Sequence, residues 1–467
     1  MVTGRGTTRG LAVLTALGMV AVLPGAVGVA SAEGLPHYRT ARGATAIKGA
    51  AIATDASQIK PGLGTDRIDR NTEKYYRIEL DARSSAYVSV VAAPRPGTKV
   101  EDYSDKLTVD IQDSDGASCT SESSQSFHGD GTPYPIGDYA ERLVGGDRTQ
   151  CQAAGLYYVV VTRKGPETSG PEDWPIELRF VTEPGLKGTA PSAPAEGNWP
   201  TRTPPPRTDP TTQPATGGTG FNDAASVTGG VWKDRIRPGE TRFYRVPVDW
   251  GQRLNLRAEL PNASAPGSSS VRDGFGLSVF NPARGLVSGD NFVLYDGKPT
   301  TVKEFTAPIA YENRFTTTSA VKAMRFAGWY YLEVTLNSHA TRYFPKGTDF
   351  ILRVDVRNEA KAGPAYAGPA PEFTVTDADR EMARTGRAEE AAGGNNTLRA
   401  VGYAGIGTGV VLLVGLGVWT LVARRRVVSP GAPGAAAARP PQEGQPAPPQ
   451  QSQHGGQQQQ FGPPQNW

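Results

Sequence analysis

The stretch GLYYVVV at residues 155–161 returns, nearly unchanged, as GWYYLEV at residues 328–334. Each copy has a glycine, a bulky apolar residue, two tyrosines and then a largely apolar run. Glycine permits the turn at which a strand begins, and successive side chains of a strand face opposite sides of its sheet. We therefore expect two β-strands, each with one tyrosine packed between two sheets and its hydroxyl bonded to a backbone group. Glu333 stands where the first copy has Val160. The face of the second strand that carries Trp329, Tyr331 and Glu333 is therefore expected to be wetter.

The surroundings of the two copies match as well. The sequence TDRIDRNTEKYYRIEL at residues 65–80 aligns without a gap with KDRIRPGETRFYRVPV at residues 233–248. In this alignment Asp66 lies opposite Asp234, a shift of 168 residues. The tyrosine pairs match at a slightly larger shift, so a few residues have been inserted before them. The sequence therefore predicts a tandem duplication of one domain.

Each copy has the pattern of strands and turns. Short runs rich in Val, Ile, Tyr and Leu are separated by clusters of Gly, Pro, Asp and Ser. The run RLNLRAEL at residues 253–260 alternates apolar and polar residues, as expected for a strand with one packed face and one wet face. Neither copy contains a long stretch with helical periodicity. The sequence predicts an all-β fold with two tandem β-sandwich domains, at residues 45–182 and residues 221–358.

Proline marks the segments between and after the two domains. Residues 183–220 are rich in Pro, Thr and Gly, which predicts an extended linker. At about 3.1 Å per residue this linker would separate the domains by up to roughly 120 Å, so that they engage their targets independently. Residues 359–399 predict a stalk that contains a short helix over residues 376–392.

Both ends of the chain carry segments that predict export and membrane insertion. Residues 1–32 contain arginines, an apolar run and small residues at the end, as in a secretory signal peptide. Residues 400–423 are uncharged and would span roughly 36 Å as a helix, which predicts one transmembrane helix. Three arginines follow and favour the cytoplasmic side, so the N-terminal region is expected outside the plasma membrane. Residues 424–467 predict a disordered cytoplasmic Pro/Gln-rich tail. A GxxxG spacing in the glycine-rich span is compatible with self-association.

The charge balance and the cysteines restrict the function further. The chain has 49 Lys and Arg against 46 Asp and Glu, a formal net charge of +3. Without a basic stripe, nucleic acid is not expected as a partner. Cys119 and Cys151 are the only two cysteines. In an exported protein an isolated pair predicts a disulfide.

The order of motifs resembles the bacterial pre-peptidase C-terminal (PPC) domain. In the second copy, PGETRFYRVPVDWGQRLNLRAEL (residues 238–260) is followed by GLSVFNPARG (residues 276–285) and by GWYYLEV. The first copy fits less closely, with NTEKYYRIELDARSSAYVSVVAA and GLYYVVV. The resemblance implies a jelly-roll-like β-sandwich for each copy and a non-catalytic accessory or binding module at the cell exterior. No peptidase is attached here, and the composition is similar to that of high-GC Gram-positive proteins.

Few residues point to chemistry. The GxSxG, HExxH, Walker-type and GxGxxG motifs are lacking in the context that their chemistry needs, so neither enzyme activity nor a cofactor is expected. Asp110, Asp113 and Asp115 have a spacing that can hold calcium, but a hairpin turn is favoured because the second copy lacks them. Trp250 and Trp174 lie in predicted loops, where a ring can stack on a sugar or anchor a protein. A ring folded back over a sheet edge is the alternative.

The sequence thus predicts a non-catalytic, single-pass cell-surface protein. Its two extracellular modules would bind or scaffold a cell-envelope glycan or a surface or membrane protein. Two alternatives stay open: a subunit of a membrane complex that contacts partners through its cytoplasmic tail, and an envelope hydrolase whose site no motif reveals.

Overall fold

A computed structural model describes most of the chain between residues 34 and 387. The described residues are 34–120, 123–145, 149–189, 191–195, 197, 199, 204–209, 211–263, 269–289 and 291–387. The predicted signal peptide, transmembrane helix and cytoplasmic tail lie outside these ranges. Among the residues within them, no helix is long and apolar enough to cross a membrane.

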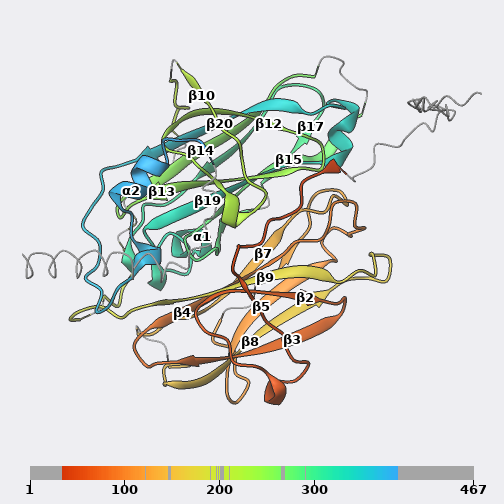
Figure 1. The fold of residues 1–467 in the computed structure, drawn as a ribbon. Coiled ribbons are helices and arrows are strands. Elements are labelled where there is room, and N and C mark those ends of the chain that lie inside the picture. Colours follow the sequence, from red (N-terminus) through yellow and green to blue (C-terminus); the bar gives the residue numbers. More distant parts are fainter. Residues whose placement is uncertain are drawn as a thin grey trace, which may run out of the picture. The chain divides into compact units, whose positions relative to one another are not determined.

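The first half of the described chain forms two β-sheets, drawn red to yellow in Figure 1. Sheet 1A has the strand order β1-β2-β9-β4-β7, and sheet 1B has the order β3-β8-β5-β6. The strands are β1 Thr45–Ala46, β2 Gly62–Ile68, β3 Thr72–Leu80, β4 Ser85–Ala92, β5 Lys106–Asp113, β6 Gln125–Ser126, β7 Ile136–Arg142, β8 Gly155–Lys164 and β9 Trp174–Glu183. A 3-10 turn, η2, covers Ala53–Asp55.

The second half forms two further sheets, drawn green to blue in Figure 1. Sheet 2A has the order β10-β12-β20-β14-β18, and sheet 2B has the order β11-β13-β19-β15-β16, with β17 also paired to β15. The strands are β10 Thr212–Pro214, β11 Ala225–Ser226, β12 Gly230–Ile236, β13 Thr241–Val248, β14 Arg253–Leu260, β15 Val271–Phe280, β16 Leu286–Ser288, β17 Phe292–Tyr295, β18 Thr300–Phe305, β19 Gly328–Leu336 and β20 Thr348–Arg357. Short helices are η3 Phe221–Asp223, η4 Tyr311–Phe315, α1 Ser319–Lys322, η5 Ser338–Arg342, η6 Pro371–Phe373 and α2 Asp377–Met382.

The two halves repeat one strand order. The order β2-β9-β4-β7 in sheet 1A corresponds to β12-β20-β14-β18 in sheet 2A, and β3-β8-β5 corresponds to β13-β19-β15. In each half the facing sheets enclose an apolar core, such as that between Val88 of sheet 1A and Val159 of sheet 1B. The prediction of an all-β fold built from β-sandwiches is therefore confirmed, and the repeated order agrees with a duplication.

The tyrosine pairs occupy the places that the sequence predicts. Strands β8 and β19 begin at Gly155 and Gly328, whose φ angles are 151° and 135°. Tyr157 and Tyr330 point into the cores and are 3% and 0% exposed. Each hydroxyl donates to the carbonyl oxygen four residues earlier, at 2.7 Å and 2.8 Å. The prediction of one packed tyrosine per pair, bonded to the backbone, is confirmed.

The opposite face of β19 is drier than predicted. Tyr331 is 9% exposed and Glu333 only 4%. Tyr331 packs in an apolar cluster with Phe221 of η3 and with Val91 of the first sandwich. The expectation of a wetter face was wrong, because η3 and the first sandwich cover it.

The aligned aspartates make the same contacts in both copies. Asp66 and Asp234 each accept a hydrogen bond from a tyrosine ten residues later, Tyr76 at 2.9 Å and Tyr244 at 2.6 Å. The same carboxylate oxygen also accepts from the backbone N–H of a glycine seventeen residues earlier, at 2.8 Å and 2.7 Å. A Cβ on either glycine would lie within 3 Å of the tyrosine ring. The repeated Asp and Tyr therefore preserve a structural contact at the edge of each core.

We expect Tyr76→Phe and Tyr244→Phe each to lower the free energy of unfolding by about 1.5 to 3 kcal/mol, the usual range for a hydrogen bond to a charged group. Tyr75→Phe is a matched control, since its hydroxyl bonds to the exposed carboxylate of Glu73. Its effect should stay below about 0.5 kcal/mol. Urea denaturation of the full chain measures all three, and a loss at Tyr75 equal to that at Tyr76 would contradict this interpretation.

The described parts of the predicted linker are packed rather than extended. The backbone N–H of Lys187 donates to Ala365 at 2.7 Å, and that of Ala367 donates to Gly185 at 2.7 Å. Strand β10, also within the linker, pairs in parallel with β12. An extended linker that holds the domains far apart is therefore not what this structure contains.

The predicted stalk is also packed, as far as residue 387. Helix α2 begins after Thr376, as predicted, and the Thr376 hydroxyl caps it, but the helix ends at Met382, earlier than predicted. Asp379 of this helix accepts from the indole N–H of Trp329 at 3.1 Å. Further along, the N–H of Gly386 donates to Ser226 at 3.0 Å. This part of the stalk thus lies along sheet 2B.

Candidate functional site: the seam between the sandwiches

Strand β9 gives the first sandwich a second packed face. Leu178 and Phe180 lie in the core, whereas Glu177 and Glu183 alternate with them and point the other way. Both glutamates are nevertheless only 1% exposed. The reason is that the second sandwich covers this face of sheet 1A, with Arg284 bonded to Glu177 and Arg314 bonded to Glu183. We call this contact between sheet 1A and the second sandwich the seam.

The carboxylate of Glu183 is the centre of one buried cluster in the seam. Arg314, from η4, donates to both carboxylate oxygens at 3.0 Å and 2.8 Å. The hydroxyls of Tyr87 and Tyr366 also donate to it, each at 2.7 Å. The guanidinium carbon lies 3.4 Å from the centre of the Tyr311 ring. Burying two charges costs several kcal/mol per ion unless the pairing geometry is good, and a bidentate pair with two added donors meets that condition.

A second carboxylate of the seam, Glu141 of β7, is paired in a similar way. Lys322 lies 2.7 Å from one oxygen, and Arg325 pairs with the other. Burial alone would raise the pKa of Glu141, but the charges of Arg325 and Lys322 outweigh burial and lower the pKa to about 2. For Glu183, burial is likewise outweighed by Arg314 and the hydroxyl donors, so its pKa is also lowered. Both carboxylates are therefore ionised at neutral pH.

Glu177 joins three parts of the chain. Arg284 of the second sandwich lies 2.6 Å from one carboxylate oxygen, and the Asn222 amide donates to both oxygens at 2.9 Å and 2.8 Å. The N-terminal segment adds the Tyr38 hydroxyl at 3.1 Å and the Ala41 N–H at 2.8 Å. This segment, red in Figure 1, thus bonds to the residue that links the two sandwiches.

Apolar side chains fill the seam between the ion pairs. One cluster combines Tyr87 and Val181 of sheet 1A with Phe326 and Phe373 of the second half. The rings of Tyr87 and Phe326 lie edge to face, with their centres 5.0 Å apart. Apolar burial supplies the main favourable energy of such contacts, while the ion pairs fix their geometry. The two sandwiches are therefore held as one body.

We expect acid to open the seam before either sandwich unfolds. Because the folded-state pKa values of Glu141 and Glu183 are lowered, their contribution to stability is complete above about pH 4.5 and is lost as the pH falls. For Glu141 the loss extends toward pH 2. Asp138 inside the first sandwich acts in the opposite direction, since burial raises its pKa to about 6 and protonation removes a buried charge. Small-angle scattering should show expansion below about pH 4 while far-UV circular dichroism is retained. If the expansion and the loss of the circular dichroism signal occurred at the same pH, a separate opening of the seam would be contradicted.

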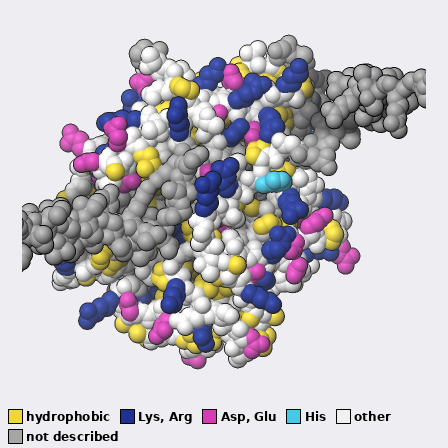
Figure 2. Space-filling view, viewed as in Figure 1, with side chains coloured by type: hydrophobic (Ala, Val, Ile, Leu, Met, Phe, Trp, Pro, Cys, Tyr) yellow, Lys and Arg dark blue, Asp and Glu magenta, His cyan; other side chains and the backbone are white. Residues whose placement is uncertain are grey.

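A pocket of about 670 Å³ opens beside Glu177. Its walls come from the N-terminal segment, with His37 and Thr40, from residues 93–97 after β4, and from the start of β9. His37, Thr40 and Arg95 are exposed. In Figure 2, Lys and Arg side chains and one histidine lie across the middle of this face, where Figure 1 draws the red N-terminal segment. The pocket is thus next to the seam and depends on the same segments.

The aspartates considered for calcium form a hairpin turn. One oxygen of Asp113 accepts from the N–H groups of Asp115 and Ala117, at 3.0 Å and 2.9 Å. Asp110 is bonded instead to the Ser118 hydroxyl at 2.6 Å. No group of three potential ligands arranged to hold a metal is found in the described part of the chain. The geometry therefore matches the favoured interpretation of these residues as a turn.

The two tryptophans considered for binding are inside the protein. Trp250 is 8% exposed and belongs to the core of the second sandwich, where residues near Gly363 of the stalk lie against its ring. Trp174 is 1% exposed, and the guanidinium of Arg163 lies 3.6 Å from its ring centre. Contrary to the binding hypothesis, neither ring offers a face to a ligand in this structure.

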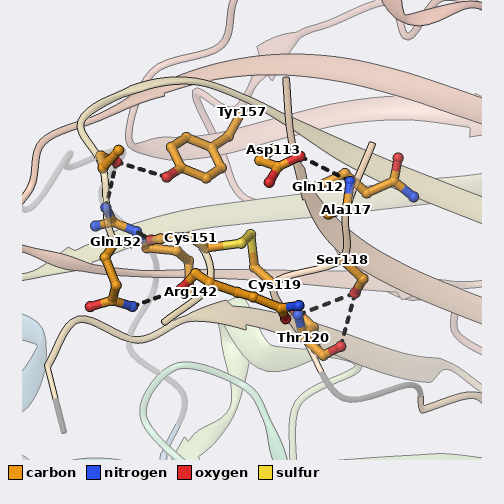
Figure 3. Close-up of a disulfide and its surroundings, with 12 residues drawn as sticks. Gln112, Asp113, Ala117, Ser118, Cys119, Thr120, Arg142, Cys151, Gln152 and Tyr157 are labelled. Carbon is orange, nitrogen blue, oxygen red and sulfur yellow. Dashed lines mark hydrogen bonds between the residues drawn. A yellow bond between two sulfur atoms is a disulfide. The ribbon is translucent and has the colours of Figure 1, made fainter. Parts of the chain in front are cut away.

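Cys119 and Cys151 form the predicted disulfide. Figure 3 shows Arg142 and Tyr157 beside it. The Arg142 guanidinium donates to the carbonyl of Cys151 at 2.6 Å and to that of Ala153 at 2.9 Å, and the Tyr157 hydroxyl donates to the same Ala153 carbonyl. The disulfide therefore holds the segment whose carbonyls satisfy a buried arginine.

Sequence reasoning missed the seam because its partners are far apart in the chain. Glu183 and Arg314, for example, are separated by 131 residues. One signal was present: β4 reads SAYVSVVA and is buried at every position. In an antiparallel sheet, an apolar strand without polar alternation indicates cover on both faces.

The chain matches no protein-family model and none of the curated proteins. Among solved structures, it is similar to the tandem CBM51 modules of a family 98 glycoside hydrolase from Streptococcus pneumoniae, with 9% identity, 63% of this chain and 83% of that chain covered, and a TM-score of 0.18. The tandem CBM22-1-CBM22-2 domain from Paenibacillus barcinonensis has 12% identity, 68% and 93% coverage and a TM-score of 0.18. The ANX2 ectodomain from Arabidopsis thaliana has 10% identity, 62% and 83% coverage and a TM-score of 0.17. TM-scores of this size carry no argument about ligand or function.

Proposed function

We propose that the chain is a non-catalytic, single-pass cell-surface protein whose two β-sandwiches bind or scaffold cell-envelope glycan or protein. The observation that supports this proposal is the seam. Its buried carboxylates are each engaged by arginine or lysine of the second sandwich, so these charges fix one sandwich against the other. An arrangement of this kind favours the display of one rigid surface. We also propose that each sandwich is PPC-like, on the motifs quoted above.

The proposed location rests on two supports. One is the sequence of residues 1–32 and residues 400–423, with its pattern of export signal and membrane span. The other is the disulfide between Cys119 and Cys151, because disulfides persist mainly outside the reducing cytoplasm.

A rigid pair of modules binds differently from two modules on a flexible tether. Flexibly linked modules gain affinity through effective concentration, which depends on linker length. Two modules held by a seam instead present surfaces at a fixed distance and orientation. We therefore expect the protein to bind one ligand across both sandwiches, or neighbouring groups at one fixed spacing.

Cross-linking on intact cells tests the proposal. A membrane-impermeant cross-linker should capture an envelope glycan or protein on the full chain, and a variant that lacks residues 427–467 should capture the same partner. If capture depends on those residues, a membrane-complex subunit that acts through its tail is the better description. Turnover of a glycan, peptide or ester substrate by the purified chain would instead establish a hydrolase.

A further inference from the structure

We infer that the pocket beside Glu177 binds an acidic saccharide, with Arg95 as the main contact for its negative charge. This inference rests on the proposed binding function and names a ligand class for one site. The pocket volume of about 670 Å³ lies within the range of about 300 to 1,000 Å³ that is usual for small-molecule sites.

The pocket wall contains unpaired positive and polar groups. Arg95 and His37 line the pocket and are exposed. Among the described residues, neither side chain forms an ion pair or a hydrogen bond, whereas Arg284, Arg314 and Arg325 are all paired in the seam. A planar guanidinium with free N–H groups matches the geometry of a carboxylate or a phosphate.

The acidic residue in the wall does not cancel this charge. Glu177 lines the pocket, but Arg284, Asn222 and Tyr38 already engage its carboxylate. Its charge is thus compensated by an arginine that does not itself line the pocket. An anion that enters beside Arg95 therefore meets a cation on one side and a neutralised carboxylate on the other.

The walls favour a hydroxylated body over an acyl chain. Pro94, Pro96 and Pro175 provide apolar faces, while Thr40 and His37 provide hydrogen-bonding groups. Because the rim is exposed, a bound ligand would keep part of its surface in water. An acyl chain gains little from a site that leaves it wet, whereas a saccharide keeps its outer hydroxyls hydrated and packs its C–H face on the apolar wall.

Calorimetric titration of the full chain, purified in mild detergent, tests this inference. The probes are a galacturonic acid trisaccharide for a carboxylate, glucose 6-phosphate for a phosphate, and a neutral galactose trisaccharide. We expect at least one acidic probe to bind, the neutral one to bind at least about tenfold more weakly, and Arg95→Glu to weaken acidic binding by about tenfold or more. His37→Ala should weaken it severalfold. Binding of one acidic probe alone identifies which anion the site prefers.

Arg83→Glu is the matched control, because Arg83 is exposed and lies outside the pocket lining. This substitution changes the net charge by the same amount as Arg95→Glu. The inference is overturned if no acidic probe binds, if the neutral probe binds as well, or if Arg83→Glu weakens binding as much as Arg95→Glu. Capture on intact cells separates the two proposals. If the Arg95→Glu variant captures the partner as well as the unaltered chain does, the pocket is not the binding site, but the proposed binding function stands. If the unaltered chain captures nothing, the binding function itself is wrong.

Discussion

Arg314→Ala is expected to lower the free energy of unfolding by about 3 to 5 kcal/mol, the range for breaking a buried ion pair by removing one partner. The substitution leaves the Glu183 carboxylate 1% exposed with hydroxyl donors but no cation. If the Glu183 carboxylate stayed ionised, it would be a buried charge without compensation. If it became protonated at neutral pH, its pKa would have to rise above neutral. Denaturant unfolding of the full chain measures the loss.

Two further variants separate the ion pair from other effects of the substitution. Arg384→Ala removes an exposed pair with Glu381, whose side chains are 69% and 72% exposed, and should cost less than about 0.5 kcal/mol. The double variant Arg314→Met with Glu183→Gln should recover part of the loss, because it removes both buried charges and keeps an amide oxygen that can accept from the Tyr87 and Tyr366 hydroxyls. A cost for Arg314→Ala as small as that for Arg384→Ala would show that the seam does not depend on this pair.

The repeated part of the fold could be predicted because its signals are local. Strand alternation and the tyrosine pairs depend on residues within one strand, and the aligned Asp66 and Asp234 depend on a tyrosine ten residues away. Such patterns survive in a single sequence because neighbouring positions determine them. For this reason the all-β fold and the packed tyrosines follow from the chain alone.

The seam could not be predicted because its charges look like solvent-exposed ones. On β9, Glu177 and Glu183 alternate with core residues, which is the usual pattern of a strand with one wet face. Only the position of the second sandwich turns these glutamates into buried partners. Their arginines, Arg284 and Arg314, lie 107 and 131 residues further along the chain, so no local pattern connects them with these glutamates.

The same limit applies to the tryptophans. Trp250 follows a strand in the turn Asp249-Trp250-Gly251, so the sequence places it at a loop tip. The stalk then returns over that tip, with the N–H of Lys361 donating to the Trp250 carbonyl at 2.8 Å. No sequence pattern near Trp250 indicates that a segment more than a hundred residues later packs over it. The search for a binding residue therefore moves from the aromatic rings to Arg95 and the pocket.

Removal of the disulfide by Cys119→Ala with Cys151→Ala is expected to lower the free energy of unfolding by about 3 to 4 kcal/mol in the chain-entropy account, for a sequence separation of 32 residues. The structure adds a local reason for a large effect. Arg142 is fully buried, and two of the carbonyls that accept its hydrogen bonds, those of Cys151 and Ala153, lie in the segment that the disulfide holds. Guanidinium denaturation of the double variant measures the cost.

The loss should be confined to the first sandwich, because the second copy holds its tyrosine strand without a disulfide. There the Tyr330 hydroxyl donates to Phe326, next to Arg325 in the seam. Hydrogen exchange should therefore rise in β8 and in residues 149–154 and remain low in β19. Reductant should reproduce the effect in the unaltered chain and have none on the double variant. Equal exchange in β8 and β19 after reduction would mean that the disulfide stabilises the whole body through the seam instead of the first sandwich alone.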